Sequence, residues 1–298
     1  MSECCVKKEL TNKKTAVIGG DARQLVIADA LCKKGAEVFL CGFDQLNLSE
    51  PGYRKTHVDL LPFEALDAII FPGSVIGAGG YIKSSFSAGS LFISEHQLLT
   101  LPETCLLFTG IKTAWSEESA KQFIYLFEED DIAISNSIPT VEGILLLIIQ
   151  HTDFTIHGSR VVITGGGRVG KTAARVLHAL GASVTALSSD KSEIARMIEM
   201  GVTGGDLTEL KTHLTRADIW INTIPSIELI NQNTLTACHP TILIIELASN
   251  PSAAQKDHAL QKNISYLEAP SLPGLVAPKT AGEILAKAIL NQIINKGE

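Results

Sequence analysis

The chain has 298 residues, of which 45% are apolar and 19% charged, a composition typical of one large or two medium-sized soluble domains. Its formal net charge of −7 provides no basic field for nucleic acid. The N-terminal stretch is polar and lacks the apolar core of a secretion signal. The densest apolar run, residues 144–149, is far shorter than the roughly 20 residues that span a bilayer. We therefore expect a cytoplasmic protein. The six cysteines and eight histidines show no disulfide or metal-ligand spacing, and we expect no metal.

The first α/β unit begins with an apolar strand predicted over Thr15–Ile18. A Gly-Gly turn follows, then a helix over Arg23–Lys34 that ends at Gly35, and a second strand over Glu37–Cys41. The turn, G-G-D-A-R-Q, has no glycine at the third or sixth position of a dinucleotide motif. We therefore expect this unit to be a poor dinucleotide site.

The rest of residues 1–135 is predicted to complete a first parallel-sheet domain. A glycine-rich loop, Gly73–Gly80, is expected to cover a pocket or to form a long turn, and a helix is expected from Ser116 to about Phe127. The other short apolar runs, predicted as strands, are Asp67–Phe71, Leu91–Ile93, Cys105–Phe108 and Ile132–Ile134.

An apolar connecting helix is predicted over Ser135–Thr152, and residues 136–152 are assigned to it. Asn136 or Ser137 can serve as its N-cap, and Pro139 suits its first turn. Its length and apolarity fit a helix buried between two domains.

The most informative stretch is Val161–Ser189, which follows the plan strand, glycine loop, helix, strand. Gly165, Gly167 and Gly170 have the G-x-G-x-x-G spacing. In that motif the first glycine makes the tight turn, the second lets the backbone approach a pyrophosphate, and the third lets the helix pack against the strand. The helix N-terminus supplies free N–H groups for the phosphates. The motif predicts a dinucleotide site, with a plain glycine turn of an α/β domain as the alternative.

Residues 153–280 are predicted to form this dinucleotide-binding Rossmann domain. A helix is expected over Lys191–Met200, with Asp190 and Glu193 spaced as a variant capping box. The remaining strands are expected within Ala217–Ser226, Thr241–Ser249 and the start of Ile264–Gly282. A final helix within residues 281–298 is expected to pack back on the first domain. Ligands of such sheets bind beyond the carboxyl ends of the strands, so we expect a ligand cleft between two Rossmann-like, doubly wound domains.

The end of the second strand of this domain predicts the choice of cofactor. NAD-specific sites carry a carboxylate there for the ribose 2′-hydroxyl. This chain has Ser188, Ser189, Asp190 and Lys191. Two hydroxyls and a lysine suit a 2′-phosphate, and Asp190 is better explained as a helix cap. The sequence therefore favours NADP(H), with NAD(H) as the alternative.

Four stretches resemble the family of dipicolinate synthase A subunits, and together they span nearly the whole chain. They are AVIGGDARQ (Ala16–Gln24) with CGFDQL (Cys41–Leu46), FEEDDIAISNSIPTVEG (Phe127–Gly143), QHTDFTIHGS (Gln150–Ser159) and APSLPGLVAPKTAG (Ala269–Gly282). Ser271 stands where the family pattern has glycine. More distantly, the plan resembles the two-domain 2-hydroxyacid dehydrogenases. Those enzymes use a late histidine as a base, whereas the loop Ala269–Gly282 contains none.

The resemblance implies NADP-dependent oxidation of dihydrodipicolinate, or of its hydroxy-tetrahydro precursor, to pyridine-2,6-dicarboxylate. It also implies sporulation, a flavoprotein-like B subunit of dipicolinate synthase as partner, and the mother cell as the location; a homo-oligomer is compatible with it. The alternatives are a non-catalytic NADP-binding scaffold and a dehydrogenase for another small oxo or imino acid. Aromatisation supplies driving force, so the protein's main task is to hold two carboxylates and to orient the ring.

Candidate site residues follow from position and chemistry. Substrate-binding candidates are Arg23, Asp21, Ser137, Thr140 and Lys279, and the catalytic candidates are Lys279 and Thr140. Cofactor-binding candidates are Gly165, Gly167, Arg168, Val169, Gly170, Ser188, Ser189, Lys191, Asn222 and Thr223. Each has a plain structural alternative: Asp21 as a cap with Arg23 solvated, Lys279 as an exposed lysine, and Ser137 or Thr140 as a cap or hinge.

Overall fold

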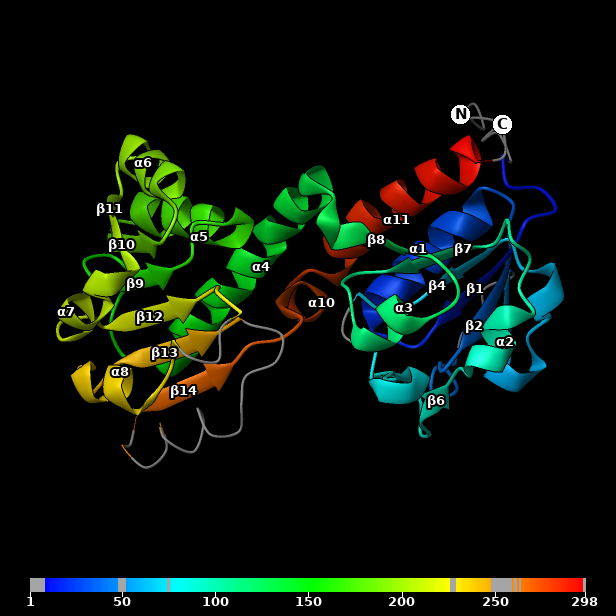
Figure 1. Cartoon of the computed structure of the whole chain (residues 1–298), viewed down its shortest axis with the longest axis horizontal. Helices are drawn as coiled ribbons and strands as arrows, with labels where there is room; N and C mark the ends of the chain where they lie inside the picture. Colours follow the sequence, from blue (N-terminus) through cyan, green and yellow to red (C-terminus); the bar gives the residue numbers. More distant parts are fainter. Residues whose placement is uncertain are drawn as a thin grey trace. The chain divides into compact units, whose positions relative to one another are not determined.

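The computed structural model describes residues 9–47, 52–73, 76–225, 229–247, 259, 262 and 264–296. The chain forms two compact units, residues 1–136 with 277–298 and residues 137–276 (Figure 1). Cys4, Cys5, Ser226 and Ser249 lie outside the described residues, as does part of the predicted Gly73–Gly80 loop.

The first unit is built on a six-stranded parallel sheet with the order β3-β2-β1-β4-β7-β8. Its strands are β1 (Lys14–Ile18), β2 (Glu37–Cys41), β3 (Tyr53–Lys55), β4 (Ala68–Ile70), β7 (Leu106–Thr109) and β8 (Phe123–Tyr125). Its helices are α1 (Ala22–Lys33), α2 (Glu95–Leu99), α3 (Ala114–Glu118) and α11 (Pro278–Asn295). A small antiparallel pair is formed by β5 (Tyr81–Ile82) and β6 (Leu91–Phe92).

Alternation along β1 divides the core of this unit into two layers. Val17 points into a cluster that also holds Ile27 of α1 and Ile289 of α11. Ala16 and Ile18 point to the other face, where they join a cluster that contains Leu98 of α2. Because successive side chains of a strand point to opposite faces, a sheet buried on both sides requires a continuous apolar run such as this one.

The second unit repeats the plan with the strand order β11-β10-β9-β12-β13-β14. The strands are β9 (Arg160–Thr164), β10 (Ser183–Ser188), β11 (Thr203–Asp206), β12 (Ile219–Asn222), β13 (Leu243–Glu246) and β14 (Ser265–Glu268). The helices are α5 (Arg168–Ala179), α6 (Lys191–Glu199), α7 (Leu210–Leu214), α8 (Gln232–Ala237) and α10 (Leu272–Val276). Two doubly wound parallel sheets were predicted from the sequence, and this fold class is confirmed.

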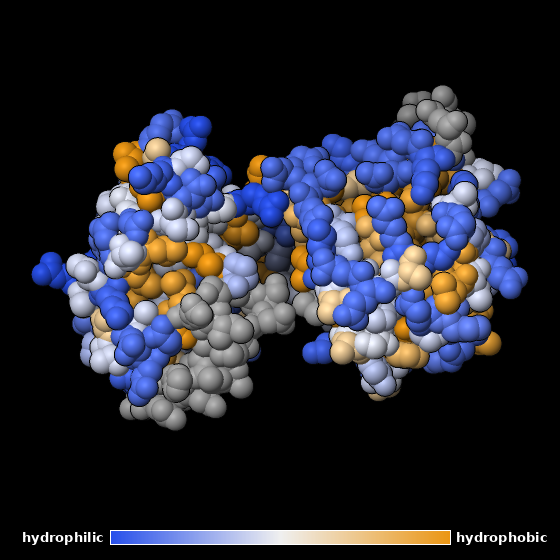
Figure 2. Space-filling model, viewed as in Figure 1, coloured by the Kyte–Doolittle hydropathy of each residue, from blue (hydrophilic) through white to orange (hydrophobic). Residues whose placement is uncertain are grey.

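Hydrophilic side chains cover much of each unit on the face shown in Figure 2, where they separate scattered hydrophobic patches. Some large apolar side chains are exposed on helices, among them Leu99 of α2 and Ile198 of α6. Single exposed apolar side chains of this kind are normal on folded domains and do not by themselves indicate a binding surface.

Helix α4 (Asp130–His151) differs from the prediction at its start. The expected caps, Asn136 and Ser137, and the expected first-turn Pro139 are all inside the helix. Asp130 and Asp131 occupy the first turn instead, where negative charge complements the helix dipole. The strand predicted at Ile132–Ile134 was therefore wrong, because its β-branched residues belong to this helix.

Helix α4 is also long and apolar enough to cross a membrane by length and composition. Val141, Ile144 and Ile148, however, are buried in the core of the second unit. One face of α4 is therefore packed in the core of a folded unit, while Ile138 and Ile149 on other faces are exposed.

Two other predictions were wrong. The helix expected over Ser116–Phe127 is short, because α3 ends at Glu118 and the aromatic and β-branched Phe123–Tyr125 form strand β8. The run Leu91–Ile93 was expected in the parallel sheet, but Leu91–Phe92 pairs antiparallel with β5.

Candidate active site

The sheet of the second unit leads into a glycine loop at the start of α5. Strand β9 ends at Thr164, and Gly165 follows with a φ of +103°, a conformation that favours glycine. A Cβ atom at Gly165 would lie 2.2 Å from Oγ1 of Thr223, and one at Gly170 would lie 2.0 Å from the carbonyl oxygen of Gly165. The turn and the close packing of α5 therefore both require glycine.

Gly167 is different, because nothing lies within 4 Å of the position of its missing Cβ atom. It is exposed, and it is the N-cap of α5 without a capping side chain. The first N–H groups of a helix have no intrahelical acceptor. This open backbone, followed by the exposed Arg168 and the half-buried Val169, suits the approach of a pyrophosphate.

The NADP prediction assumed that the hydroxyls at the end of β10 are free to bind a 2′-phosphate, and this is not so for Ser188. Ser188 is 5% exposed, and its hydroxyl donates to Oε2 of Glu193 at 2.6 Å and accepts the backbone N–H of Asp190 at 3.1 Å. Asp190 caps α6, as expected, by accepting the N–H of Ser192. The expected capping-box partner, Glu193, instead turns toward Ser188. Ser189 and Lys191 are exposed.

A buried polar network lies at the carboxyl ends of β9, β12 and β13. Oγ1 of Thr164 donates to Oδ1 of Asn222 at 2.7 Å and accepts the indole N–H of Trp220 at 3.1 Å. The amide nitrogen of Asn222 donates to both carboxylate oxygens of Glu246, at 3.1 and 2.8 Å. Asn222 has no exposed surface. It can therefore hold the loop after β12, but in this conformation it cannot touch a cofactor directly.

Two further polar residues of this sheet are Thr223, directly after β12, and Tyr266, the second residue of β14. Thr223 is half-buried, and its hydroxyl donates to the carbonyl oxygen of Thr164 at 2.9 Å. Burial, with Glu246 and Glu268 nearby, raises the pKa of the Tyr266 phenol. Sequence reasoning missed Glu246. A carboxylate that ends an otherwise apolar strand, in TILIIELAS, was the available signal.

In the first unit, Arg23 is buried rather than solvated, with 3% of its surface exposed. Its Nε and Nη2 donate to the two carboxylate oxygens of Asp21, at 2.9 and 2.8 Å. Asp21 is the N-cap of α1 and forms a capping box with Gln24. The expected cap is therefore present, and the guanidinium forks onto that cap.

Helix α11 brings the second predicted cation into the same unit. A Cβ atom at Gly282 of α11 would lie 2.6 Å from Cβ of Val26 and 2.9 Å from the carbonyl oxygen of Arg23, so the two helices pack closely (Figure 1). Lys279 is exposed in the first turn of α11. Neither α1 nor α11 has an acidic residue in its first turn. Near these helix ends the charges and dipoles favour an anion, with Asp21 as the opposing charge.

The glycine turn of the first unit is occupied by protein. The N–H of Gly20 donates to the carbonyl oxygen of Lys83 at 2.8 Å, and the N–H of Ser85 donates to that of Gly20 at 2.8 Å. A Cβ atom at Gly19 would lie 2.6 Å from Cγ2 of Ile82. The segment after β5 thus lies where a dinucleotide would approach, which supports the expectation of a poor site here.

The two candidates in α4 have different surroundings. Ser137 has no exposed surface, and its hydroxyl lies 2.7 Å from that of Thr172 in α5. It joins the two helices of the second unit and offers no surface for a substrate. Thr140 is half-buried one turn further along.

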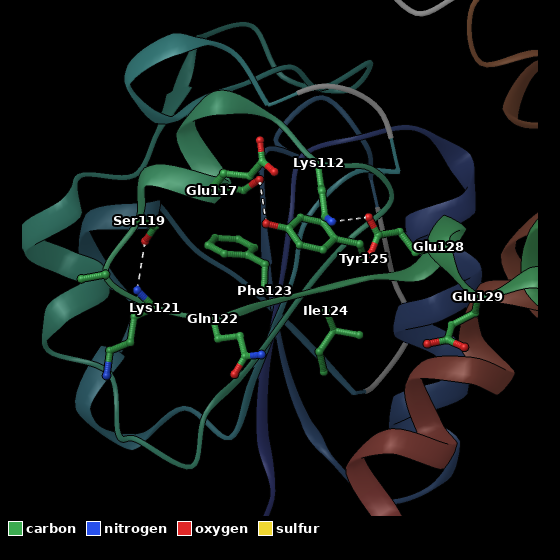
Figure 3. Close-up of a pocket in the computed structure, with 12 residues that line it drawn as sticks. Lys112, Glu117, Ser119, Lys121, Gln122, Phe123, Ile124, Tyr125, Glu128 and Glu129 are labelled. Carbon is green, nitrogen blue, oxygen red and sulfur yellow. Dashed lines mark hydrogen bonds and ion pairs between the residues drawn. The ribbon is translucent and has the colours of Figure 1, made fainter. Parts of the chain in front are cut away.

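A groove of about 680 Å³ lies beside the edge strand β8 (Figure 3). Its lysines are already paired. Lys112 bonds to Glu128 at 2.7 Å and lies over the ring of Tyr125, and Lys121 bonds to Glu103 at 2.9 Å. The groove is therefore a poor place for a dicarboxylate.

The second unit resembles the NAD-binding domain of known dehydrogenases. Residues 149–263 match the model of the D-isomer specific 2-hydroxyacid dehydrogenase, NAD binding domain. Together with the glycine loop and the strand order, this match defines an NAD(P)-dependent oxidoreductase with a Rossmann-type domain.

The particular family follows from the rest of the chain. Residues 14–128 match the N-terminal domain of the dipicolinate synthase A subunit. The chain is 46% identical to the dipicolinate synthase A subunit of Bacillus subtilis (strain 168) over 284 residues, which cover 94% of this chain and 95% of that protein. It therefore belongs to the family of dipicolinate synthase A subunits.

Two solved structures of that family have the same fold. The dipicolinate synthase A subunit from Bacillus halodurans has a TM-score of 0.92 at 38% identity and covers 96% of this chain and 99% of its own. The Bacillus subtilis protein has a TM-score of 0.84 at 44% identity and covers 97% of this chain and 99% of its own.

Proposed function

We propose that this chain oxidises dihydrodipicolinate, or its hydroxy-tetrahydro precursor, to pyridine-2,6-dicarboxylate during sporulation. The observation that carries the proposal is membership of the dipicolinate synthase A-subunit family over nearly the whole chain. The open Gly167 backbone at the start of α5 supports dinucleotide binding by the second unit.

The reaction balances as loss of one hydride and one proton from the dihydropyridine ring; the hydroxy-tetrahydro precursor first loses water. A nicotinamide dinucleotide held by the glycine loop of the second unit would supply the hydride acceptor. Lys279 and the uncapped first-turn N–H groups of α11 are the groups of the first unit that can meet a substrate carboxylate in this conformation. Arg23 is buried and paired with Asp21, so it holds a carboxylate only after its fork onto Asp21 opens. Aromatisation favours release of the ring proton, and Lys279 or Thr140 is the candidate group to receive or relay it.

The sequence favoured NADP(H) because Ser188, Ser189 and Lys191 could bind a 2′-phosphate. The hydroxyl of Ser188 is bonded to Glu193, so this preference depends on Ser189 and Lys191. The relative from Bacillus subtilis is an A subunit by name, which supports a heteromeric synthase. We propose a flavoprotein-like B subunit as the partner and the cytoplasm of the mother cell as the location, with a homo-oligomer as a further possibility.

The test is an assay of the purified chain, alone and with the candidate partner. The substrate is generated in place by enzymatic condensation of aspartate semialdehyde with pyruvate, and either dinucleotide is added. Dinucleotide-dependent appearance of an ultraviolet-absorbing pyridine dicarboxylate supports the proposal. Product that forms with the partner but without any dinucleotide indicates a scaffold. Oxidation of a different oxo or imino acid, with no pyridine formed, indicates another dehydrogenase.

A further inference from the structure

The strand order of the first sheet reverses between β1 and β4. These two strands are paired at the centre of the order β3-β2-β1-β4-β7-β8. In open parallel sheets, ligands bind beyond the carboxyl ends of the strands at such a reversal. Arg23 follows β1, in the first turn of α1, and Gly73 follows β4. Both residues therefore lie where a sheet of this kind binds a ligand.

The loops after β4, β7 and β8 pack closely beside Gly73. A Cβ atom at Gly110, the residue after β7, would lie 2.2 Å from the carbonyl oxygen of Gly73. The carbonyl oxygen of Gly110 accepts the backbone N–H of Phe127 at 3.0 Å, just beyond β8. The hydroxyl of Thr109 donates to the carbonyl oxygen of Pro72 at 3.3 Å. These contacts fix Gly73 and Phe127 relative to the sheet.

Gly73 has no side chain at the point where Phe127 and Arg23 come together. A Cβ atom at Gly73 would lie 3.4 Å from Cε2 and 3.6 Å from Cζ of Phe127, and 3.7 Å from Nη1 of Arg23. These are ordinary van der Waals distances, so this space holds a carbon-sized group without displacing either side chain. The φ of Gly73 is not positive, so its backbone conformation does not require glycine. Gly73 and Phe127 are half-buried, which leaves part of each accessible.

An aromatic ring beside a guanidinium matches a flat ring that carries a carboxylate. A phenyl ring contacts another flat ring edge-to-face or offset-stacked. A guanidinium binds carboxylates through its fork of N–H groups. Nε and Nη2 of Arg23 hold Asp21, while Nη1 lies beside the space at Gly73. A carboxylate that replaces Asp21 on this guanidinium would therefore lie next to that space, with its ring toward Phe127.

We propose that the space beside Gly73 is a substrate subsite, in which Arg23 takes one carboxylate and Phe127 contacts the ring that carries it. Phe127 is then a specificity-determining residue, because its ring favours a flat partner over a saturated one. A side chain in place of the glycine would fill the subsite. The inference rests on the proposed function for its ligand class, a flat six-membered ring with carboxylates.

The first test measures the dissociation constant of pyridine-2,6-dicarboxylate by calorimetry, in buffer free of divalent metal ions and with either dinucleotide present. The proteins are the wild type, Gly73→Ala and the control Gly89→Ala. Gly89 belongs to the same unit and has nothing within 4 Å of its missing Cβ atom. Gly73→Ala should keep the wild-type melting temperature but bind at least about tenfold more weakly, since its methyl group takes the place of the ligand. Gly89→Ala should change neither value.

A second test examines the ring with two ligands, benzene-1,3-dicarboxylate and cis-cyclohexane-1,3-dicarboxylate. They carry the same two carboxylates on a flat and on a saturated ring. The wild type should bind the flat ring more tightly, and Phe127→Leu should narrow that ratio by about two- to tenfold, the contribution of an aromatic pair. Phe86→Leu, at another half-buried phenylalanine of the same unit, should leave the ratio unchanged.

Three results would overturn the subsite: no binding of these dicarboxylates by the wild type, wild-type affinity in Gly73→Ala, or an unchanged ratio in Phe127→Leu. If Gly73→Ala is unstable, the ratio in Phe127→Leu decides. Pyridine formation with wild-type kcat/KM in both variants would also overturn the subsite and leave the proposed reaction standing. Weakened binding in both variants, without dinucleotide-dependent pyridine formation by the wild type, would overturn the proposed reaction alone.

Discussion

Asn222 and Glu246 end neighbouring strands, and one amide nitrogen of Asn222 bonds to both carboxylate oxygens of Glu246, at 3.1 and 2.8 Å. The same nitrogen also donates to the carbonyl oxygen of Ile224 at 3.0 Å, while Oδ1 accepts the N–H of Ile224 at 3.2 Å. Glu246 is 1% exposed. The carboxylate therefore orients an amide that fixes the first turn after β12. We infer that Glu246 is a positioning residue of the second unit.

Glu246→Gln tests this role. The carboxylate offers two acceptor oxygens to the amide nitrogen of Asn222, whereas a glutamine offers one acceptor oxygen and places a second donor beside that nitrogen. We expect a loss of about 1–3 kcal/mol in the free energy of unfolding, the cost of a buried unsatisfied group. Urea denaturation followed by fluorescence of the buried Trp220 measures it in a Trp115→Phe background. Glu199→Gln, at an exposed site, serves as the control. A variant as stable as the wild type would show that the charge on Glu246 is not needed.

A second prediction concerns pH and the pair Arg160–Asp218. Asp218 accepts the backbone N–H of Arg160 at 2.8 Å and its guanidinium at 3.1 and 2.7 Å, which joins β9 to the start of β12. This arrangement lowers the pKa of Asp218 below its usual 3.8. The carboxylate is thus stabilised in the folded state. Its contribution is fully present above about pH 4 and is lost as pH falls through the lowered pKa.

Asp218→Asn should therefore unfold more easily at pH 7, by about 1 kcal/mol, since Arg160 is half-exposed. The difference from the wild type should shrink below pH 4. Thermal unfolding at pH 7, 5 and 3 measures both effects. If the difference in stability between Asp218→Asn and the wild type stays constant across this pH range, the charge of Asp218 does not contribute to stability.

The sequence was sufficient for the central strands of both sheets, such as β9 and β12, because their apolar runs are buried on both faces. An apolar run alone was not decisive, since Phe123–Tyr125 forms strand β8 and Ile132–Ile134 lies in helix α4. The sequence was also insufficient where a strand lacks that pattern. Strand β11 (Thr203–Asp206) has the sequence TGGD and lies at the edge of its sheet, so no apolar run marks it. At the cofactor site, the glycine spacing located the loop, but the direction of Glu193 depends on the hydroxyl of Ser188, which residue spacing alone does not determine.

Alanine substitutions at two glycines of the loop, Gly167 and Gly170, should have opposite effects on stability and on dinucleotide binding. Gly167→Ala should fold normally, because its Cβ atom meets nothing within 4 Å, yet bind a dinucleotide at least about tenfold more weakly, since the methyl group lies where the pyrophosphate approaches. Gly170→Ala should be unstable, because its Cβ atom would lie 2.0 Å from a backbone oxygen. Melting temperature and dinucleotide affinity are measured for both. A Gly167→Ala protein with wild-type affinity would place the pyrophosphate elsewhere.

The last prediction concerns the cations of the first unit. Arg23→Ala removes the guanidinium that we assign to a substrate carboxylate, and it should lower kcat/KM by about ten- to a hundredfold. Dinucleotide affinity should stay nearly unchanged, because Arg23 and the glycine loop belong to different compact units. Arg23→Lys keeps the charge but loses the fork onto Asp21, so an intermediate effect is expected.

Because Arg23 is buried, Arg23→Ala can also reduce stability, and Lys279→Ala provides the independent test. Lys279 is exposed, so its removal should leave the melting temperature unchanged. We expect a smaller loss of kcat/KM than for Arg23→Ala, since a lysine is a single point charge on a flexible stem. Glu283→Ala, one turn along the same helix, is the matched control. If Arg23→Ala and Lys279→Ala instead weaken dinucleotide binding and leave substrate kinetics unchanged, the assignment of substrate to the first unit is reversed.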